Sequence, residues 1–164
     1  MKNILLGLLL MALGTAASAV PPAQGGFSFA DTVVRVPLAE DVGAEDAVDS
    51  MKLRANTLNM MFVAHQPLSK QIEAMGVDTR HIEIFQFCDP LIAGEMVKKD
   101  IIFAAYMPCR IAMVEDDSGQ LWLVMMDLDF FLQAAKLTPE LAKVGMEVRD
   151  KLMSIIEAGA NGDL

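Results

Sequence analysis

The feature that most restricts the fold is a predicted β-hairpin in the second half of the chain. Two apolar segments, 108–115 and 120–126, flank the short run Asp116-Asp117-Ser118-Gly119. A run of turn-forming residues between two strand-like segments is a strong hairpin signal. A chain with this hairpin places two antiparallel strands side by side, so an all-helical fold is excluded.

The segments before the hairpin include further strands. The β-branched residues of 32–38 predict a first strand, which ends near Pro37. Residues 81–87 alternate, with Ile82 and Ile84 on one face and Phe85 and Phe87 on the other. Because successive side chains of a strand point to opposite faces, both faces of this strand are apolar. It is therefore predicted to lie in the interior of a sheet.

Helical patterns separate the strands. Val48, Met51, Ala55, Leu58 and Phe62 recur at three- and four-residue steps and predict one apolar helical face, although residues 61–64 also fit a short strand. The other predicted helices cover about 67–75, a segment from residue 90 opened by Asp89-Pro90, and a long segment over 138–158. This order predicts an α+β fold: a two-layer single domain with a mostly antiparallel sheet packed against helices.

The N-terminus has the composition of a secretory signal peptide. A basic start at Lys2 precedes the apolar run 4–13 and the small residues Ala17-Ser18-Ala19. The apolar run is too short to span a bilayer, which needs roughly 20 residues. We expect cleavage after Ala19, delivery to the periplasm and no stable membrane insertion. The predicted divisions are a signal peptide at 1–19, a flexible leader at 20–30, the domain at 31–158 and a tail at 159–164.

The composition restricts the partners. The net charge of −9 makes nucleic acid a poor partner, because an acidic domain repels phosphate backbones and anionic lipid surfaces. The 13 methionines are unusual. Methionine fills irregular cores, which is the simplest interpretation, and its thioether can also bind soft metals such as Cu(I).

The two cysteines, Cys88 and Cys109, are the main chemical feature, and three interpretations stay open. They could form a disulfide, which an oxidising compartment favours. They could be separate buried thiols, or they could serve a metal, haem or redox site. Cys88 immediately precedes a predicted helix N-terminus, where the helix dipole lowers a thiol pKa, while the Asp89 carboxylate opposes that effect.

The two histidines are His65, between a strand and a helix, and His81, near the start of a strand. Copper accepts Cys, His and Met ligands together, and haem iron accepts each of them as an axial ligand. Covalent c-type haem is excluded, because the sequence has no C-x-x-C-H run. Glu83 is interpreted as a cross-strand salt-bridge partner.

Known catalytic motifs are missing from the sequence. It contains no G-x-S-x-G, no H-E-x-x-H and no glycine-rich phosphate loop. The carboxylate groups Glu45-Asp46 and Glu115-Asp116-Asp117 fit solvated helix-start and turn positions. These observations favour a non-catalytic protein over an enzyme.

Three stretches together resemble the domain of unknown function 302 family. They are Phe87-Cys88-Asp89-Pro90, with Met96 after it, then Pro108-Cys109-Arg110-Ile111-Ala112, and then the acidic turn that runs from Glu115 to Trp122. In that family an [FC]-x-[ND]-P step opens a helix, an L-P-[LC]-R strand follows, and an E-D-x-x-G-K turn comes next. The resemblance covers about residues 32–132.

The chain looks like the branch with Cys at both positions, which is often exported and occurs in sulfur-oxidising and related proteobacteria. It lacks the commoner G-N-P step, so roles of cytosolic members do not carry over. The resemblance implies a compact α+β fold, often a homodimer, and brings no established reaction.

Three functional hypotheses follow. The first is a non-catalytic module that binds a small ligand or protein partner in a cleft near Cys88, Asp89, Cys109 and Arg110, with His65 as a further candidate. Arg110 could bind an anion there or form a structural ion pair. The second is a haem- or copper-binding redox accessory, linked to sulfur metabolism, that uses His65, Cys88 and Cys109. The third is a thiol-based enzyme.

Overall fold

The structure, a computed structural model, describes residue 26 and residues 28–163. The predicted signal peptide and most of the predicted leader therefore lie outside the described residues. Within the described part, no helix is long and apolar enough to cross a membrane.

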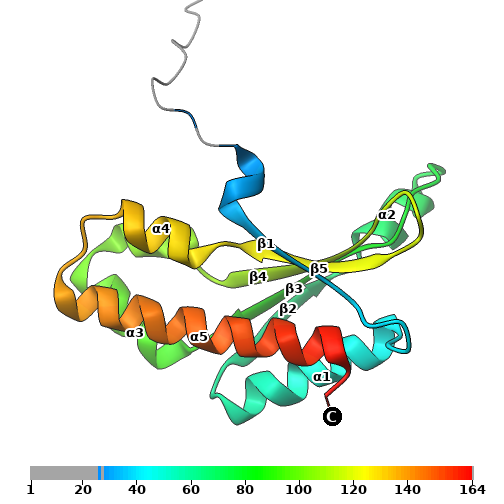
Figure 1. The fold of residues 1–164 in the computed structure, drawn as a ribbon. Coiled ribbons are helices and arrows are strands. Elements are labelled where there is room, and N and C mark those ends of the chain that lie inside the picture. Colours follow the sequence, from blue (N-terminus) through cyan, green and yellow to red (C-terminus); the bar gives the residue numbers. More distant parts are fainter. Residues whose placement is uncertain (1–25, 27, 164) are drawn as a thin grey trace, which may run out of the picture.

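A five-stranded antiparallel sheet forms the centre of the fold (Figure 1). Its strands are β1 (Val33–Pro37), β2 (Met61–Gln66), β3 (Ile82–Cys88), β4 (Cys109–Glu115) and β5 (Leu121–Met126), in the order β1-β5-β4-β3-β2. The predicted hairpin is confirmed as β4–β5. Asp116 Oδ1 accepts hydrogen bonds from the amides of Ser118 and Gln120, and Gly119 supplies the positive φ of 84° that closes the turn.

Two long helices cover one face of this sheet. The α-helices are α1 (Ala44–Thr57), α2 (Leu68–Ala74), α3 (Pro90–Lys99), α4 (Leu128–Ala134) and α5 (Pro139–Asn161), and the short 3₁₀ helices are η1 (Phe29–Thr32) and η2 (Ile101–Tyr106). The long helices α1 and α5 pack against each other on the same face (Figure 1). The predicted two-layer α+β architecture is confirmed.

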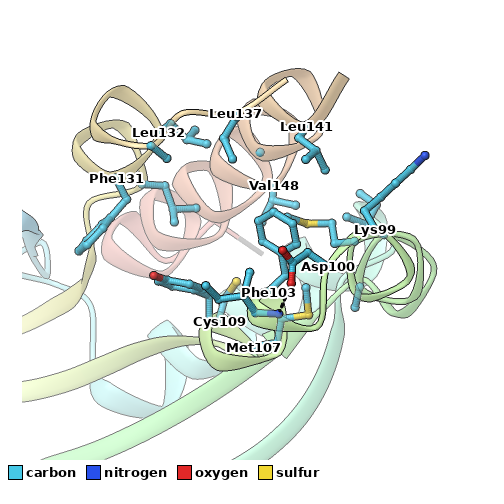
Figure 2. A pocket seen from close by; sticks show the side chains of 18 of the residues that line it. Lys99, Asp100, Phe103, Met107, Cys109, Phe131, Leu132, Leu137, Leu141 and Val148 are labelled. Atoms are coloured by element: carbon cyan, nitrogen blue, oxygen red, sulfur yellow. Dashed lines mark hydrogen bonds between the residues drawn. The ribbon is translucent and has the colours of Figure 1, made fainter. Parts of the chain in front are cut away.

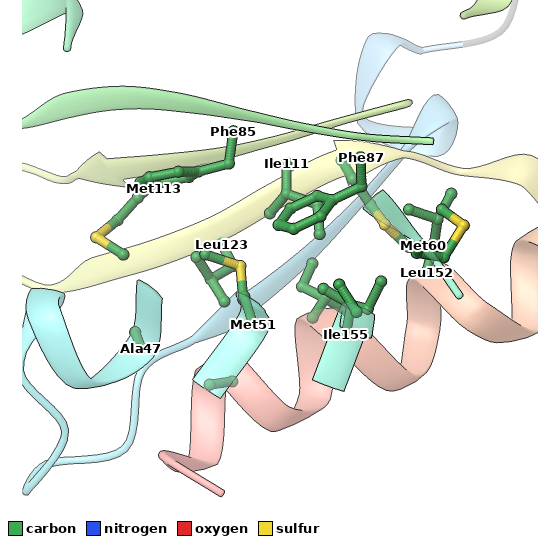
Figure 3. Close-up of a cluster of buried hydrophobic side chains, with 14 of the residues drawn as sticks. Ala47, Met51, Met60, Phe85, Phe87, Ile111, Met113, Leu123, Leu152 and Ile155 are labelled. Carbon is green, nitrogen blue, oxygen red and sulfur yellow. The ribbon is translucent and has the colours of Figure 1, made fainter. Parts of the chain in front are cut away.

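The core lies between the sheet and these two helices. Phe85, Phe87, Ile111, Met113 and Leu123 point from the strands toward α1 and α5 and are fully buried (Figure 3). Each such side chain contributes about 1.5–3 kcal/mol by burial. Helix α5 approaches closely because it carries Gly159, where a Cβ would lie 2.5 Å from Met51 Cγ.

The opposite face of the sheet has a different composition. The strand register places the apolar side chains of Ile84, Ala112 and Val124 on this face, where they are half-buried. Arg35 pairs with Val124 and Arg110 pairs with Gln86, so both guanidinium groups lie on this side and are exposed. This face thus combines apolar residues with two cations.

Several element bounds differ from the prediction. The first helix ends at Thr57, and Phe62 belongs to β2, because Asn59 adopts a left-handed φ of 57° that turns the chain. The last helix continues to Asn161, since Ala158 and Ala160 are buried and Gly162 provides the left-handed C-cap. The prediction missed η1, η2 and α4.

Candidate ligand-binding cavity

A cavity of about 660 Å³ lies where β3 and β5 end and β4 begins. Helices α3, η2, α4 and α5 surround it. Figure 2 shows two opposing sets of side chains around the space, with Leu132, Leu137 and Leu141 on one side and Phe103, Met107 and Cys109 on the other. The lining is predominantly aliphatic, aromatic and sulfur-containing, which is typical of small-molecule sites.

The α3 wall is held by a nearly buried ion pair. Asp89 is the N-cap of α3, and its Oδ1 accepts from the amides of Leu91 and Ile92 at 3.1 Å. Its Oδ2 accepts from Lys151 Nζ of α5 at 2.9 Å, and the two side chains are only 10% and 16% exposed. This pair ties the α3 N-terminus to α5.

The pKa values of the pair are perturbed together. Burial raises the pKa of Asp89, but the hydrogen bond from Lys151 and those from the Ile92 and Leu91 amides outweigh burial and hold it below its ordinary value. The hydrogen bond to Asp89 raises the pKa of Lys151, against the opposing effect of burial. Both groups are therefore charged near neutral pH and are engaged with each other.

Both cysteines line the cavity as free thiols. Cys109 pairs with Phe87 and packs against the core, so Cys88, the next residue after Phe87, starts on the opposite side of the sheet. The two cysteines reach the same cavity because it lies beyond the strand ends. This one-residue offset starts the two side chains on opposite faces, and of the three interpretations that the sequence leaves open, the disulfide is not formed in this structure.

Neither thiol is activated. Burial raises the pKa of Cys109 to about 11, with a further contribution from the charge of Cys88. Burial also raises the pKa of Cys88, and the Asp89 carboxylate adds to this. The lowering that a helix N-terminus favours is thus not realised at Cys88.

Sulfur is concentrated in the cavity lining. The six residues that contribute it are Met60, Cys88, Met96, Met107, Cys109 and Met126. The thioether side chain is polarisable and unbranched, so a methionine-rich wall adapts to ligands of different shape. The sequence alone favours core filling for the methionines. The fold shows in addition that four of them line one cavity together with both cysteines.

Arg110 and His65, two of the predicted site residues, do not line the cavity. Arg110 follows Cys109 on β4 and is exposed on the outer face of the sheet. His65 is four residues along β2 from Met61, which pairs with Cys88, so it lies toward the far end of the sheet. The predicted grouping of His65 with both cysteines is therefore not assembled. Among the described residues, no group of three His, Cys, Asp or Glu side chains is arranged to hold a metal ion.

His65 belongs instead to a polar cluster around Glu83. His65 Nε2 lies 2.7 Å from Glu83 Oε2, and its ring stacks on Phe85 with centroids 4.9 Å apart. His81 Nε2 lies 3.8 Å from Glu83 Oε1. Glu83 is thus a cross-strand partner, as the sequence predicts, and its contact with His65 is at hydrogen-bond distance.

The cavity wall formed by α4 and the following loop was missed from sequence. A usable signal exists, because Asp127 Oδ1 accepts hydrogen bonds from the amides of Asp129 and Phe130 as an N-cap. An Asp before the apolar run that includes Phe130 and Phe131 is a helix-start pattern. Since the helix has only seven residues, it has too few turns for a clear periodic signal.

Comparisons with known proteins identify the fold family. A family profile described as Domain of unknown function DUF302 matches residues 34–159. The chain belongs to the DUF302 family. The DUF302 region thus includes all five strands except Val33, and it includes the cavity.

A solved DUF302 structure is similar to this chain. It is the crystal structure of an uncharacterized conserved protein DUF302 from Bacillus stearothermophilus, with a TM-score of 0.67 and 12% sequence identity. The match covers 77% of this chain and 97% of that chain. At this identity the likeness shows the shared fold. None of the curated proteins compared with this chain matches it.

Proposed function

We propose that this DUF302 chain is an exported, non-catalytic module that binds a small apolar molecule in the cavity. The observation that carries the proposal is the sulfur-rich, predominantly apolar space of about 660 Å³ at the end of the sheet. Small-molecule sites in proteins have volumes of roughly 300–1,000 Å³. A ligand gains free energy here mainly by leaving water for an apolar wall.

The polar groups of the cavity support binding over chemistry. Asp89 is engaged by Lys151 and by two backbone amides, so its carboxylate does not serve as a general base. The raised pKa values of Cys88 and Cys109 keep both thiols protonated near neutral pH, and the protonated thiol is a poor nucleophile. These features favour a binding module over a thiol-based enzyme.

A cavity-filling variant tests the proposal. Ala93 of α3 lines the cavity, so Ala93→Phe should place a ring in the space. Ala74 of α2 does not line it, and Ala74→Phe is the matched control. With 1-anilinonaphthalene-8-sulfonate as a fluorescent probe, we expect Ala93→Phe to weaken binding at least about tenfold while the control binds as the parent chain does. Equal binding by all three proteins would contradict the proposal.

The haem or copper alternative has weaker support. His65 is held by Glu83 toward the far end of β2, so a cofactor in the cavity would have only sulfur ligands from this set. Cu(I) accepts such ligands, and the thiols would have to lose their protons on binding. A visible absorption spectrum and a metal analysis of the protein purified from a periplasmic fraction distinguish this alternative from an apolar ligand.

Export and self-association are separate parts of the proposal. Export predicts that the protein from a periplasmic fraction begins at Val20, which intact-mass measurement checks.

A homodimer could cover the apolar outer face of the sheet around Val124 and Ala112. We expect light scattering to give the mass of a dimer and Val124→Glu to give a monomer. A monomeric parent chain would contradict this part alone.

A further inference from the structure

The interior of the cavity offers few hydrogen-bonding side chains to a ligand. Asp89 is the carboxylate of the interior, and Lys151 and two backbone amides already occupy its oxygens. Among the described residues, the buried side-chain nitrogen and oxygen atoms without a hydrogen-bond partner belong to His81 and Arg149, and neither residue lines the cavity. Of the polar side chains in the interior, the two thiols are left for a ligand, and thiols form only weak hydrogen bonds.

The other polar lining residues form an exposed rim around the cavity, and they are Lys99, Asp100, Tyr106, Lys136 and Thr138. Asp100 accepts from the Ile102 amide at 3.0 Å, and Thr138 accepts from the Leu141 amide at 3.4 Å, so both side chains act as helix caps. No hydrogen bond joins the Tyr106 hydroxyl to another residue that the structure describes. This hydroxyl is therefore available at the rim as both donor and acceptor.

The charged groups of the rim carry both signs. Lys99 extends outward from the cavity (Figure 2) and is followed directly by Asp100. Lys136 lies four residues before Glu140, at the start of α5. Hydrogen bonds lower the pKa of Glu140, and the charge of Lys99 lowers it further, so these two side chains sense each other. Because two carboxylates accompany the two lysines, the rim gives little net attraction to a charged ligand of either sign.

We propose that the cavity takes an uncharged amphiphile of the long-chain alcohol class, with its hydroxyl at Tyr106 on the rim and its chain in the interior. A second polar group farther along the chain would lose its hydrogen bonds to water and find no partner inside, which weakens binding about tenfold or more. A plain hydrocarbon chain has no such groups and gains free energy by leaving water. This inference rests on the proposed function, since it names the ligand class for the same cavity.

Competition with 1-anilinonaphthalene-8-sulfonate tests the ligand class. All proteins are purified as the cell produces them, with the N-terminus defined by mass. The competitors are decanol and the diol that carries a second hydroxyl at the far end of the same chain. We expect decanol to displace the fluorescent probe from the parent chain and the diol to need an at least about tenfold higher concentration. Equal displacement by the two compounds would overturn the proposal.

A hydroxyl introduced into the interior should reduce this difference. Val148 of α5 lines the cavity (Figure 2), and Val148→Thr adds a hydrogen-bonding group with little change of shape. We expect decanol and the diol to differ by less than about threefold in this variant. Val144, on the same helix, does not line the cavity, so Val144→Thr should keep the difference of the parent chain. An unchanged difference in Val148→Thr would overturn the proposal, because the difference would then reflect the competitors alone.

The polar end of the ligand has its own tests. Tyr106→Phe removes the hydroxyl and keeps the ring, so decanol should bind about fivefold more weakly, as expected for one lost neutral hydrogen bond. Decanoate and decyltrimethylammonium carry opposite charges, and they should bind within about threefold of each other and no more tightly than decanol. Unchanged binding of decanol by Tyr106→Phe, or an about tenfold preference for one charge, would overturn the proposal.

Two outcomes separate this inference from the proposed function. If decanol and the diol displace the probe equally while Ala93→Phe weakens probe binding, the ligand class is overturned and the cavity function stands. If Ala93→Phe binds both the probe and decanol as the parent chain does, the cavity function fails and this inference fails with it.

Discussion

The two ends of the sheet contain the same strands but have opposite polarity. At one end, Cys88 and Cys109 lead into an apolar cavity that α3, η2, α4 and α5 surround. At the other end, His65 and His81 face Glu83 in a polar cluster. Only a few residues of β3 separate these environments. The comparison teaches that the helices packed beyond the strand ends, rather than the strands, determine where a ligand can bind.

The largest expected effect is at the cavity end. Lys151→Ala leaves the nearly buried Asp89 carboxylate without its cationic partner. Because two amides still donate to Asp89 and both residues are only partly buried, we expect a loss of about 1–2 kcal/mol in the free energy of unfolding, between the values for an exposed and a buried pair. Urea denaturation measures it. Lys98→Ala, which removes an exposed pair with Glu95, should cost less than about 0.5 kcal/mol.

The Asp89 pair also has a defined dependence on pH. The pKa of Asp89 in the folded protein is below the ordinary value of 3.8. Its contribution to stability is therefore fully present above the unfolded pKa and is lost as the pH falls through the folded pKa. Lys151→Ala should lose less stability than the parent chain on acidification. An unchanged acid profile in this variant would show that Lys151 does not lower the pKa of Asp89.

The next effect concerns thiol reactivity at the same end. A pKa of about 11 for Cys109, against an ordinary 9.0, reduces its thiolate fraction at pH 8 about 100-fold. We expect iodoacetamide to modify Cys109 about 100-fold more slowly than an unperturbed thiol, as followed by mass spectrometry. Cys88→Ala should raise this rate only slightly, because burial is the larger cause. Rapid modification of Cys109 in the folded protein would contradict the assignment.

A smaller effect is expected at the polar end. Glu83→Gln removes the charge that faces His65 and His81. Since His65 is partly exposed, we expect a loss of at most about 1 kcal/mol in the free energy of unfolding and no change in probe binding at the cavity. A loss as large as that of Lys151→Ala would remove the energetic distinction between the two ends.

The smallest effect is in the hairpin near the polar end. Hydrogen bonds from the side chains of Ser118 and Trp122 lower the pKa of Asp116 to about 2. Trp122 is the single tryptophan, and its Nε1 donates to Asp116 at 2.8 Å. Its fluorescence should therefore stay constant as the pH falls from 7 to about 3. A transition near pH 4, absent in Asp116→Asn, would contradict the lowered pKa.

Local patterns in the sequence predict much of this fold. The hairpin turn depends on residues that are adjacent in the chain, and so does the Asp89 cap of α3. The two apolar faces of β3 follow from simple alternation. The sequence predicts these features correctly because each depends on interactions between residues that are close together in the chain.

The site depends on relations between distant residues, which local patterns do not contain. A one-residue offset between β3 and β4 decides that Cys88 and Cys109 start on opposite faces, and no feature near either cysteine reveals it. His65 meets Glu83 only through the β2–β3 pairing. The partner of Asp89 is Lys151, on the last helix. The cavity itself needs α4, whose seven residues are too few to show a period.

The β2 strand has a free edge and three exposed apolar residues, Met61, Phe62 and Val63. Such an edge can pair with a strand of another molecule and start aggregation. The pairing of β2 with β3 shifts register between Phe62 and Ala64, so Val63 is an extra residue that bends the strand. This irregularity makes the edge a poor template for strand addition. Deleting Val63 would straighten β2, and the protein would then be expected to lose solubility before it loses its fold.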